Sequence, residues 1–523
     1  MKIQHLFTSA RSATFAFLDG GLYETKKAYQ LTLNGEPHCE ATTVVTSLFG
    51  LQPSTKYELE VWDEDECIAG EQFETKAESY TLNVRRFGAA GDGVKDDTAS
   101  IQAAIMSCPA NGRVLIPKGK YAVLPLFLKS NIRIEIQKGA ELQLVKDRRQ
   151  FPILPGVTES TDEESELYLG TWEGNPLDMF GALITGIEVE NVDIYGEGIL
   201  NGQADQSDWW QTPKVRRGAW RGRLFFLCRS KNVHVQGIGF QNSPSWNVHP
   251  YFSQNLGFYN ISITAPANSP NTDGFDPESC SDVVVAGAHF SLGDDCIALK
   301  SGKLYMGRKY KTPCENLEIM HCLMENGHGG VTIGSEIAGG ARNVAVHDCV
   351  MRHTDRGLRI KTRRGRGKDS VIDNIRFENV QMDYVRAPIV INCLYFCDPD
   401  GHSPYVQTRE SLPVDDRTPT IGNLEFRNVH ADNCSSCAAY FLGLPEHKIK
   451  SIRLENVEFN YTQDKDIQPM EPVMAEGVEL CYKRGIIAKN MEHLYCKNVR
   501  LNGYEGELLD CENVEHSDWE EYK

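Results

Sequence analysis

Short runs of alternating apolar and polar residues recur along most of the chain and dominate its pattern. From about residue 190 onward one four-residue phrase repeats: a polar residue, usually Asn, then an apolar residue, any residue, and a second apolar residue. Alternation of this kind predicts short strands with one buried face. The copies are spaced roughly 25 to 50 residues apart, and they begin at Asn191, Asn232, Asp282, Asn316, Asn343, Asn374, Asn423 and Ser451.

A repeat of this period indicates stacked coils, in which each coil buries its apolar side chains against the next. A β-propeller would need four strands per repeat and a longer, more regular period. We therefore predict an all-β fold in which residues 79–523 form a right-handed parallel β-helix. Successive coils rise by one strand spacing, roughly 4.8 Å, so residues one coil apart in sequence lie one above another.

The first 78 residues follow a different pattern. Short alternating runs at 13–17 and 28–33 are separated by Gly, Asn and Pro, which predicts a small β-sandwich over residues 1–78. Residues 51–61, with Pro53 and Tyr57, resemble the fibronectin type III signature, in which the tyrosine forms a corner between strands. We expect this module to be a spacer or a platform beside the larger domain; a sugar-binding role is the alternative.

Two further segments flank the first coils. Asp96 or Asp97 precedes a short amphipathic run, and we expect this acid to cap a helix that closes the open end of the solenoid, rather than to bind a metal. The residues that face inward are Ile101, Ala104 and Ile105. A polar insertion at 147–180 is predicted to form a wall over one end of the binding face. Its acids are Glu159, Asp162, Glu163, Glu164 and Glu166.

Composition narrows the class of protein. The net charge of -18 over 523 residues argues against nucleic acid or an anionic membrane as the main partner, and no run of 18 apolar residues occurs. The N-terminus lacks the apolar core of a signal peptide, so we expect a cytoplasmic protein unless a leader has been removed. The 16 cysteines are scattered, and we expect reduced core thiols; Cys434 and Cys437 form a CxxC without the partners of a zinc site.

The residues that can carry chemistry fall between positions 271 and 361, inside the repeat. They form four segments: Asn271-Thr272-Asp273, Gly293-Asp294-Asp295, Gly327-His328-Gly329 and Arg359-Ile360-Lys361. Stacked coils would gather them into one patch of carboxylates flanked by positive charge. Adjacent strand residues point to opposite faces, so Asp294 and Asp295 reach one site only if a bulge or turn distorts the chain near Gly293.

In this order the four segments resemble the signatures of the glycoside hydrolases that cleave polygalacturonate, of the family 28 type. The likeness covers residues 80 to about 460, and the fused N-terminal module resembles the bacterial exo-acting branch. The resemblance implies an inverting exo-hydrolase of α-1,4-galacturonosidic bonds that uses no cofactor and no metal. It also implies that Asp294 is the general acid, that Asp273 and Asp295 hold the attacking water, and that His328 orders the acid and the substrate.

The residue chemistry agrees with these roles. Glycoside hydrolysis needs one carboxylic acid to protonate the leaving oxygen and one carboxylate to activate water or attack carbon. Clustered acids push their pKa values apart, so one stays protonated while another is ionised. The rung spacing alone places acid and base near 5 Å, which is typical of retaining enzymes; inversion is implied by the resemblance only.

Several residues are expected to bind the sugar. Arg359 and Lys361 share one strand face by their period of two, and a guanidinium binds a galacturonate carboxylate bidentately. Asn271 belongs to the same set. Trp246 and His249, one coil before Asp273, are expected to line a subsite, although a core tryptophan is nearly as good an interpretation; Tyr395 is expected to contact the sugar. The run of Arg363, Arg364, Arg366 and Lys368 is interpreted as a solvated basic loop.

Three alternatives stay open from the sequence. A related pectin hydrolase for rhamnogalacturonan or substituted galacturonan would use the same residues. A pectate lyase would need a calcium cluster and a cationic base. A non-catalytic β-helix that binds carbohydrate would have no reason to keep the three acids together. Endo or exo action, product length and oligomeric state are not fixed by these patterns.

Overall fold

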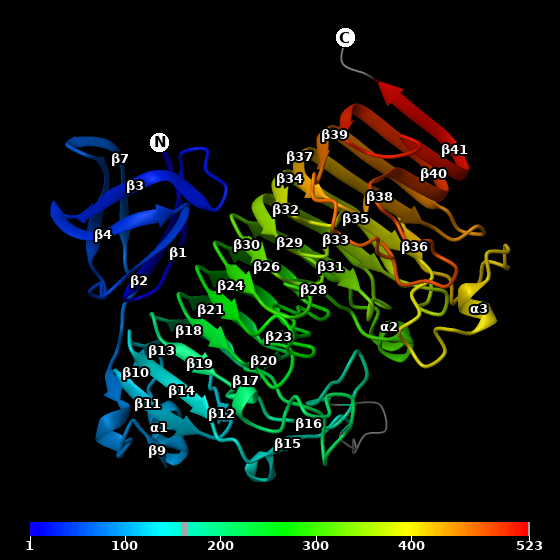
Figure 1. Ribbon diagram of the computed structural model, residues 1–523. Coiled ribbons are helices and arrows are strands. Elements are labelled where there is room, and N and C mark those ends of the chain that lie inside the picture. Colours follow the sequence, from blue (N-terminus) through cyan, green and yellow to red (C-terminus); the bar gives the residue numbers. More distant parts are fainter. Residues whose placement is uncertain (158–165, 167, 521–523) are drawn as a thin grey trace.

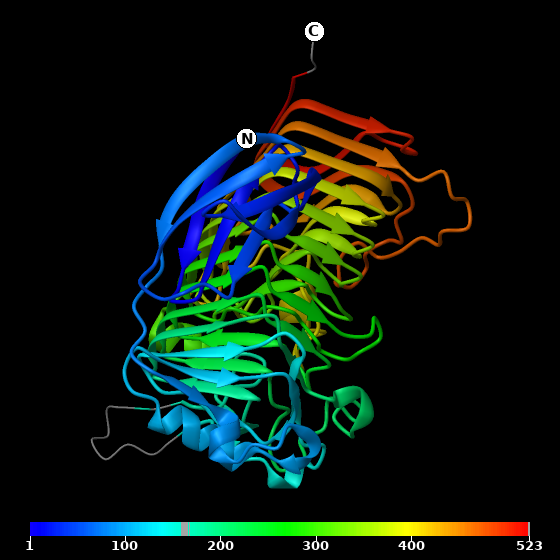
Figure 2. The same cartoon turned by 90° about the vertical axis from the view of Figure 1, so that its left-hand side faces the viewer.

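A computed structural model describes residues 1–157, 166 and 168–520 (Figure 1). Most of these residues form a parallel β-helix, and the N-terminal residues form a small β-sandwich beside its middle coils (Figures 1 and 2). The predicted all-β fold is therefore confirmed. Among the described residues, no helix has the length and apolar character required to cross a membrane.

The N-terminal sandwich consists of two antiparallel sheets. One contains β1 (Lys2–Thr8), β2 (Ser12–Leu18) and β5 (Val45–Phe49), and the other contains β3 (Glu24–Leu33), β4 (Glu36–Thr43), β6 (Lys56–Asp63) and β7 (Glu66–Glu74). Phe15, Leu31 and Leu59 belong to the core between them. The backbone N–H of Gln52 donates to the Tyr57 hydroxyl at 2.9 Å, which is the tyrosine corner expected from the sequence.

The sandwich packs directly on the flank of the β-helix. The Phe7 ring stacks on His234 with the ring centroids 4.2 Å apart. The Ser12 hydroxyl donates to Gln236 Oε1 at 2.5 Å, and both side chains are buried. Val45 joins residues of the β-helix in a separate apolar cluster. Apolar and polar contacts thus attach the module to the coils.

Three stacks of parallel strands build the β-helix. The first contains β8 (Thr81–Asn83), β10 (Gly112–Ile116), β13 (Ile132–Ile136), β18 (Glu190–Tyr195), β21 (Lys231–Gln236), β24 (Gln254–Tyr259), β26 (Ser281–Ala286) and β29 (Cys314–Met320). The second contains β9 (Asp92–Asp96), β11 (Gly119–Val123), β14 (Ala140–Leu144), β19 (Ile199–Asn201), β22 (Gly239–Gln241), β25 (Ser262–Thr264), β27 (His289–Ser291) and β30 (Leu323–Glu325).

The third stack carries the candidate site. It contains β12 (Leu126–Phe127), β17 (Ile184–Ile187), β20 (Phe225–Cys228), β23 (Val248–Tyr251), β28 (Ile297–Leu299), β31 (Val331–Gly334), β33 (Arg356–Lys361), β35 (Ala387–Asn392) and β38 (Cys437–Leu442). Longer strands continue the stacks toward the C-terminus: β32 (Ala341–Arg352), β34 (Val371–Asp383), β37 (Asn423–Cys434), β39 (Ile449–Tyr461), β40 (Arg484–Asn502) and β41 (Leu509–Glu520).

A short helix closes the N-terminal end of the coils, as predicted. In α1 (Thr98–Ser107) the buried residues are Ile101, Ala104 and Ile105. The Asp96 carboxylate accepts a hydrogen bond from Thr98 N at 2.9 Å, so Asp96 satisfies a free amide of the first turn. Asp97 makes no such cap; its oxygens accept from Ala90 N and Gly91 N at 2.6 and 2.8 Å and fix the preceding loop.

The recurring asparagines combine a left-handed backbone with a side-chain ladder. Asn343 has a φ of 55°. Its Nδ2 donates to Asn316 Oδ1 at 3.1 Å, and its own Oδ1 accepts from Asn374 Nδ2 at 2.9 Å. The three side chains are exposed, so the ladder runs along the outer surface of the coils.

The cysteines are unpaired, as expected. All 16 are free thiols, and 12 of them are buried. Cys434 and Cys437 are among the buried ones and belong to the main apolar core. They act there as small hydrophobic side chains.

The ladder yields a stability prediction at Asn343. Asn343→Ala removes both hydrogen bonds and places a Cβ-bearing residue without a local polar contact at positive φ; each effect costs on the order of 1 kcal/mol. Asn343→Gly is the matched control, since it loses the bonds but tolerates the backbone. We expect the thermal unfolding midpoint to fall in both variants, and further in the alanine variant. Equal midpoints for the two variants would show that the backbone conformation is not the reason for asparagine.

Candidate active site

The register of the third stack aligns the polar side chains. Residues 272–278 run between β23 and β28, with bridges from Phe275 to Val248 on one side and to Ile297 on the other. β28 pairs with β31, and β31 pairs with β33, in unshifted parallel register. Side chains that alternate with these buried apolar positions therefore emerge on one face in successive coils.

Three carboxylates meet on this face. Asp273, Asp294 and Asp295 each place an oxygen within 4.8 Å of the others. Asp294 and Asp295 lie in a bend between β27 and β28, so strand alternation does not separate them, as the sequence required. A Cβ at Gly293 would stand 2.7 Å from the Ser269 carbonyl oxygen, and glycine is what permits this tight bend.

Asp295 is fully buried between two cations. Lys361 Nζ lies 2.7 Å from its Oδ2, and Arg359 Nη1 lies 3.3 Å from its Oδ1. Burial alone would raise the pKa of Asp295, but Lys361 and Arg359 hold it well below the usual value. A Cβ at Gly329 would lie 2.8 Å from Asp295 Oδ1, so this glycine leaves room for the carboxylate. Asp295 is therefore a fixed anion.

The surroundings of Asp273 favour its protonated form. Its side chain is buried, and its Oδ1 has no hydrogen-bond partner among the residues that the structure describes. Burial raises the pKa of Asp273 well above its usual value, and the nearby charges of Asp294 and Asp276 raise it further. Asp294 is partly exposed to the cavity. One cluster thus contains a carboxyl that favours its proton and a carboxylate that stays ionised.

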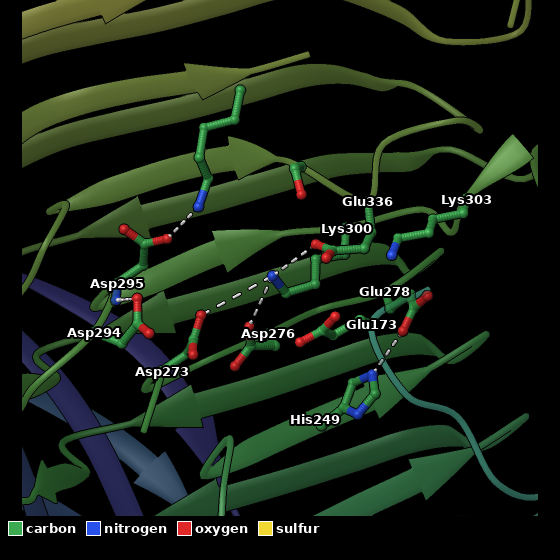
Figure 3. A network of polar contacts seen from close by, with 12 residues as sticks. Glu173, His249, Asp273, Asp276, Glu278, Asp294, Asp295, Lys300, Lys303 and Glu336 are labelled. Carbon is green, nitrogen blue, oxygen red and sulfur yellow. Dashed lines mark hydrogen bonds and ion pairs between the residues drawn. The ribbon is translucent and has the colours of Figure 1, made fainter. Parts of the chain in front are cut away.

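Lys300 is a central residue that we did not predict from the sequence (Figure 3). Its Nζ lies 3.2 Å from Glu336 Oε2, 3.5 Å from Asp276 Oδ1 and 4.0 Å from Asp273 Oδ2. It also lies 4.4 Å from the ring centroid of Trp246. Ile297 and Leu299 of β28 lie in register with Leu358 and Ile360 of β33. Aligning these apolar residues in the sequence would have placed Lys300 above or below Lys361, so the sequence did contain a signal for Lys300.

His249 does not line a subsite, and that prediction was wrong. Its side chain is completely buried, with Nε2 2.9 Å from Glu278 Oε2 (Figure 3). Arg223 Nε donates to its other ring nitrogen at 3.3 Å. Burial and the charge of Arg223 hold the pKa of His249 well below its usual value. The imidazole is a neutral element of the layer beneath the site.

His328 lies at the rim of the site. Its Nδ1 is 3.3 Å from Asp355 Oδ2, and about half of its side chain is exposed. The hydrogen bond to Asp355 raises the pKa of His328 despite partial burial. The backbone N–H of His328 donates to the Asp294 carbonyl at 3.1 Å, which links the glycine-rich turn to the acid-bearing bend.

A cavity of about 240 Å³ opens above the carboxylates. Of the expected sugar-binding residues, Asn271, Trp246, Tyr395, Arg359 and Lys361 line it. Asp295 and His249 do not, because they lie beneath its floor. The lining residues that sequence reasoning missed are Glu173, Lys214, Lys300, Ser335, Glu336, Cys397, Asp398 and Met474.

Two loops wall the cavity. In the insertion at 147–180, Gly174 O accepts from Lys303 N at 2.9 Å, and Glu173 faces Lys214 at 3.1 Å. Glu166 accepts from the Tyr305 hydroxyl at 3.0 Å, on α2 (Leu304–Tyr310). Glu159, Asp162, Glu163 and Glu164 lie outside the described residues.

The second wall comes from residues 462–483, between β39 and β40. Arg356 donates to the carbonyls of Glu471 and Pro472 at 2.9 and 3.1 Å. Asn392 Nδ2 donates to the carbonyl of Met474 at 2.9 Å, and Met474 reaches the cavity. The polar side chains of the third stack thus hold this loop by its backbone.

The arginines after Lys361 are not a solvated loop, contrary to our interpretation. Arg363, Arg364 and Arg366 are all buried. They pair with Asp400 at 2.6 Å, Glu446 at 2.6 Å and Asp398 at 2.7 Å, respectively. Only Lys368 of this run is exposed. These partners come from distant loops, which a local charge pattern does not reveal.

The buried contacts of Asp295 with Lys361 and Arg359 give a stability prediction. Lys361→Met leaves Asp295 with Arg359 as its remaining cation, and breaking a buried pair in this way costs roughly 3–5 kcal/mol. In an Asp295→Asn background the same change should cost much less, because the buried charge is already gone. Denaturation of the wild type, both single variants and the double variant measures the coupling. Additive losses would mean that the Lys361–Asp295 contact is not energetically significant.

Comparison with known proteins agrees with this site. The sequence profile of glycosyl hydrolases family 28 matches residues 115–475, and a rhamnogalacturonase A/epimerase, pectate lyase-like profile matches residues 81–138. The chain is 28% identical to a probable polygalacturonase of Vitis vinifera, over 76% of this chain and 78% of that protein. It is 32% identical to an endo-polygalacturonase of Pectobacterium carotovorum subsp. carotovorum, over 57% of this chain and 72% of that protein.

Two solved structures are similar over most of their length. A hyperthermoactive exopolygalacturonase from Thermotoga maritima has a TM-score of 0.65 at 25% identity, covering 82% of this chain and 93% of that one. The family 28 exopolygalacturonase of Yersinia enterocolitica has a TM-score of 0.72 and covers 98% of both chains; at 19% identity it supports the fold alone. With its profile match spanning well over half of the sequence, the chain belongs to glycosyl hydrolases family 28.

Proposed function

We propose that this protein is an exo-acting polygalacturonase that hydrolyses α-1,4-galacturonosidic bonds with inversion. The observation that carries the proposal is the cluster of three carboxylates, in which Arg359 and Lys361 hold Asp295 ionised while Asp273 and Asp294 line the cavity. Hydrolysis of a glycoside requires a proton donor and a base at the same time. Family membership and polygalacturonase relatives support galacturonan as the substrate.

The roles of the three acids are those that the family resemblance implies, and the exposure of Asp294 supports them. Asp294 is the partly exposed member of the three, and it gives its proton to the leaving glycosidic oxygen. The family resemblance assigns the attacking water to Asp273 and Asp295; of these, Asp273 lines the cavity and holds the water, while Asp295 lies buried beneath it. The water attacks the anomeric carbon on the other face and loses its proton to a carboxylate. The new C–O bond forms as the glycosidic C–O bond breaks. Oxygens within 4.8 Å are closer than in most inverting enzymes, so inversion rests on the family resemblance.

Positive charge in the cavity suits a uronate. Arg359 and Lys361 line the cavity and have N–H donors beyond those that face Asp295, which suits them to bind a sugar carboxylate. Lys361 Nζ lies 5.8 Å from the centroid of the Tyr395 ring, which also lines the cavity. Asn271, whose Oδ1 accepts from Arg221 at 2.7 Å, completes this polar surface.

Exo action is supported by the walls. The cavity of about 240 Å³ lies between the Gly174 segment and the Met474 loop, whereas an endo enzyme needs an open groove for a long chain. A solved exopolygalacturonase, that of Thermotoga maritima, is 25% identical to this chain. We infer that the closed end accommodates a chain terminus.

The test is the time course of products from polygalacturonate. We expect steady release of mono- or digalacturonate with little loss of viscosity, and the β-anomer first by proton NMR. Asp294→Asn should lower the rate by about 10²- to 10⁴-fold, the range for loss of a general acid. Asp205→Asn, an exposed acid on the short helix Ala204–Gln206, is the control that keeps full activity.

Other outcomes would separate the alternatives. A rapid fall in viscosity with mixed oligomers would keep hydrolysis and contradict exo action. Unsaturated products that absorb in the ultraviolet, with activity lost to a chelator, would indicate a lyase. Cleavage of rhamnogalacturonan but not polygalacturonate would favour the related pectin hydrolase, and no cleavage of either would favour a binding protein.

A further inference from the structure

The lining of the cavity contains a largely buried cation that the proposed roles of the three acids leave unexplained. Lys300 is 3% exposed and directly follows β28, on the opposite side of Asp273 from Asp295 (Figure 3). It faces three carboxylates at 3.2 to 4.0 Å. A buried ammonium is costly unless its partners compensate for lost hydration, so its place beside a reactive acid requires an explanation.

The two candidate bases differ in what surrounds them. Asp295 has both oxygens engaged by Lys361 and Arg359, which makes it a poor acceptor for a proton. Within the described part of the chain, one oxygen of Asp273 has no hydrogen-bond partner. A general base works best when its pKa lies near the working pH, and a carboxylate neutralised by two cations does not meet that condition. Asp273 is the better acceptor for the proton of water.

Asp273 has one difficulty as a base, because its surroundings oppose its ionisation. It is 4% exposed, and acidic side chains surround it, both from its own coil and from the next coil. Lys300 is the cation that most strongly opposes this effect on the pKa of Asp273. The charged groups around Asp273 are Asp276 from its own segment, Asp294 and Asp295 from the bend before β28, Lys300 from the end of β28, and Arg221 and Arg223 from the segment leading into β20.

We propose that Lys300 is a positioning residue for catalysis: its ammonium, held by Glu336 and Asp276, keeps the Asp273 carboxylate available to take the proton from the attacking water. Asp295, buried beneath the water site, holds Lys361 and Arg359 in place and accepts no proton. The proton count balances, since Asp294 gives one proton to the leaving oxygen and Asp273 receives one from water. This inference rests on the proposed hydrolase function and divides between two acids a role that the family resemblance assigns jointly.

The experiment is the pH profile of kcat/KM for galacturonate oligomers. In Lys300→Met, loss of the cation raises the pKa of Asp273, so a higher pH is needed to ionise the base. The acidic limb should therefore move upward by about one pH unit or more, as expected for removing a charge within about 4 Å of a carboxylate. Lys300→Arg keeps the charge and should keep the limb near the wild-type position.

Two further variants keep the test decisive. Lys300→Met leaves the buried carboxylate of Glu336 without its partner at 3.2 Å, which could prevent folding. The double variant Lys300→Met/Glu336→Gln removes both charges. It should fold and show the same upward shift of the acidic limb. Lys489→Met removes a surface lysine that pairs with Glu512 on the last coils and should leave the profile unchanged.

The outcomes distinguish the possible failures. A folded Lys300 variant that loses activity by the same factor at every pH would overturn the proposal and make Lys300 structural. A raised KM with an unmoved limb would also overturn it and make Lys300 a substrate-binding group. If the wild-type protein cleaves no galacturonate oligomer, the proposed function fails instead, and that result is seen before any variant is compared.

Discussion

The site depends on one buried ionic contact, that of Asp295 with Lys361 and Arg359. A carboxylate with no exposed surface is stable as an anion only if cations replace its lost hydration, and here two of them do so at 2.7 and 3.3 Å. Because that charge is fixed while burial favours the proton on Asp273, a protonated carboxyl and an ionised carboxylate lie within 4.8 Å of each other.

The β-helix makes this contact possible by its register. Asp295 precedes β28, whereas Lys361 ends β33, and 66 positions separate them in the chain. Only two coil pairings separate them in space, because Ile297 pairs with Val331 and Val331 pairs with Leu358. The apolar columns fix the height of each coil, and the polar residues between them emerge at set positions. Loops at the coil corners are then free to build walls around the face.

Periodicity in the sequence was enough to predict the solenoid, the capping helix and the face that gathers the three acids. It also required a bend at Gly293, which the structure contains. His249 was misplaced because alternation does not distinguish a side chain that reaches the cavity from one that a second layer covers. Arg363 and its neighbours were misplaced because their partners, such as Glu446, come from loops that follow no period. Lys300 was overlooked, although its register with Lys361 was readable.

The most direct measurement is neutron diffraction from deuterium-exchanged crystals, at a pH one unit below the acidic limb of the rate profile. The surroundings of the three acids predict a deuteron on Asp273 and none on Asp295, since burial favours the first proton and two cations exclude the second. A deuteron on Asp295, or a bare Asp273 at that pH, would contradict the division of acid and base on which the mechanism depends.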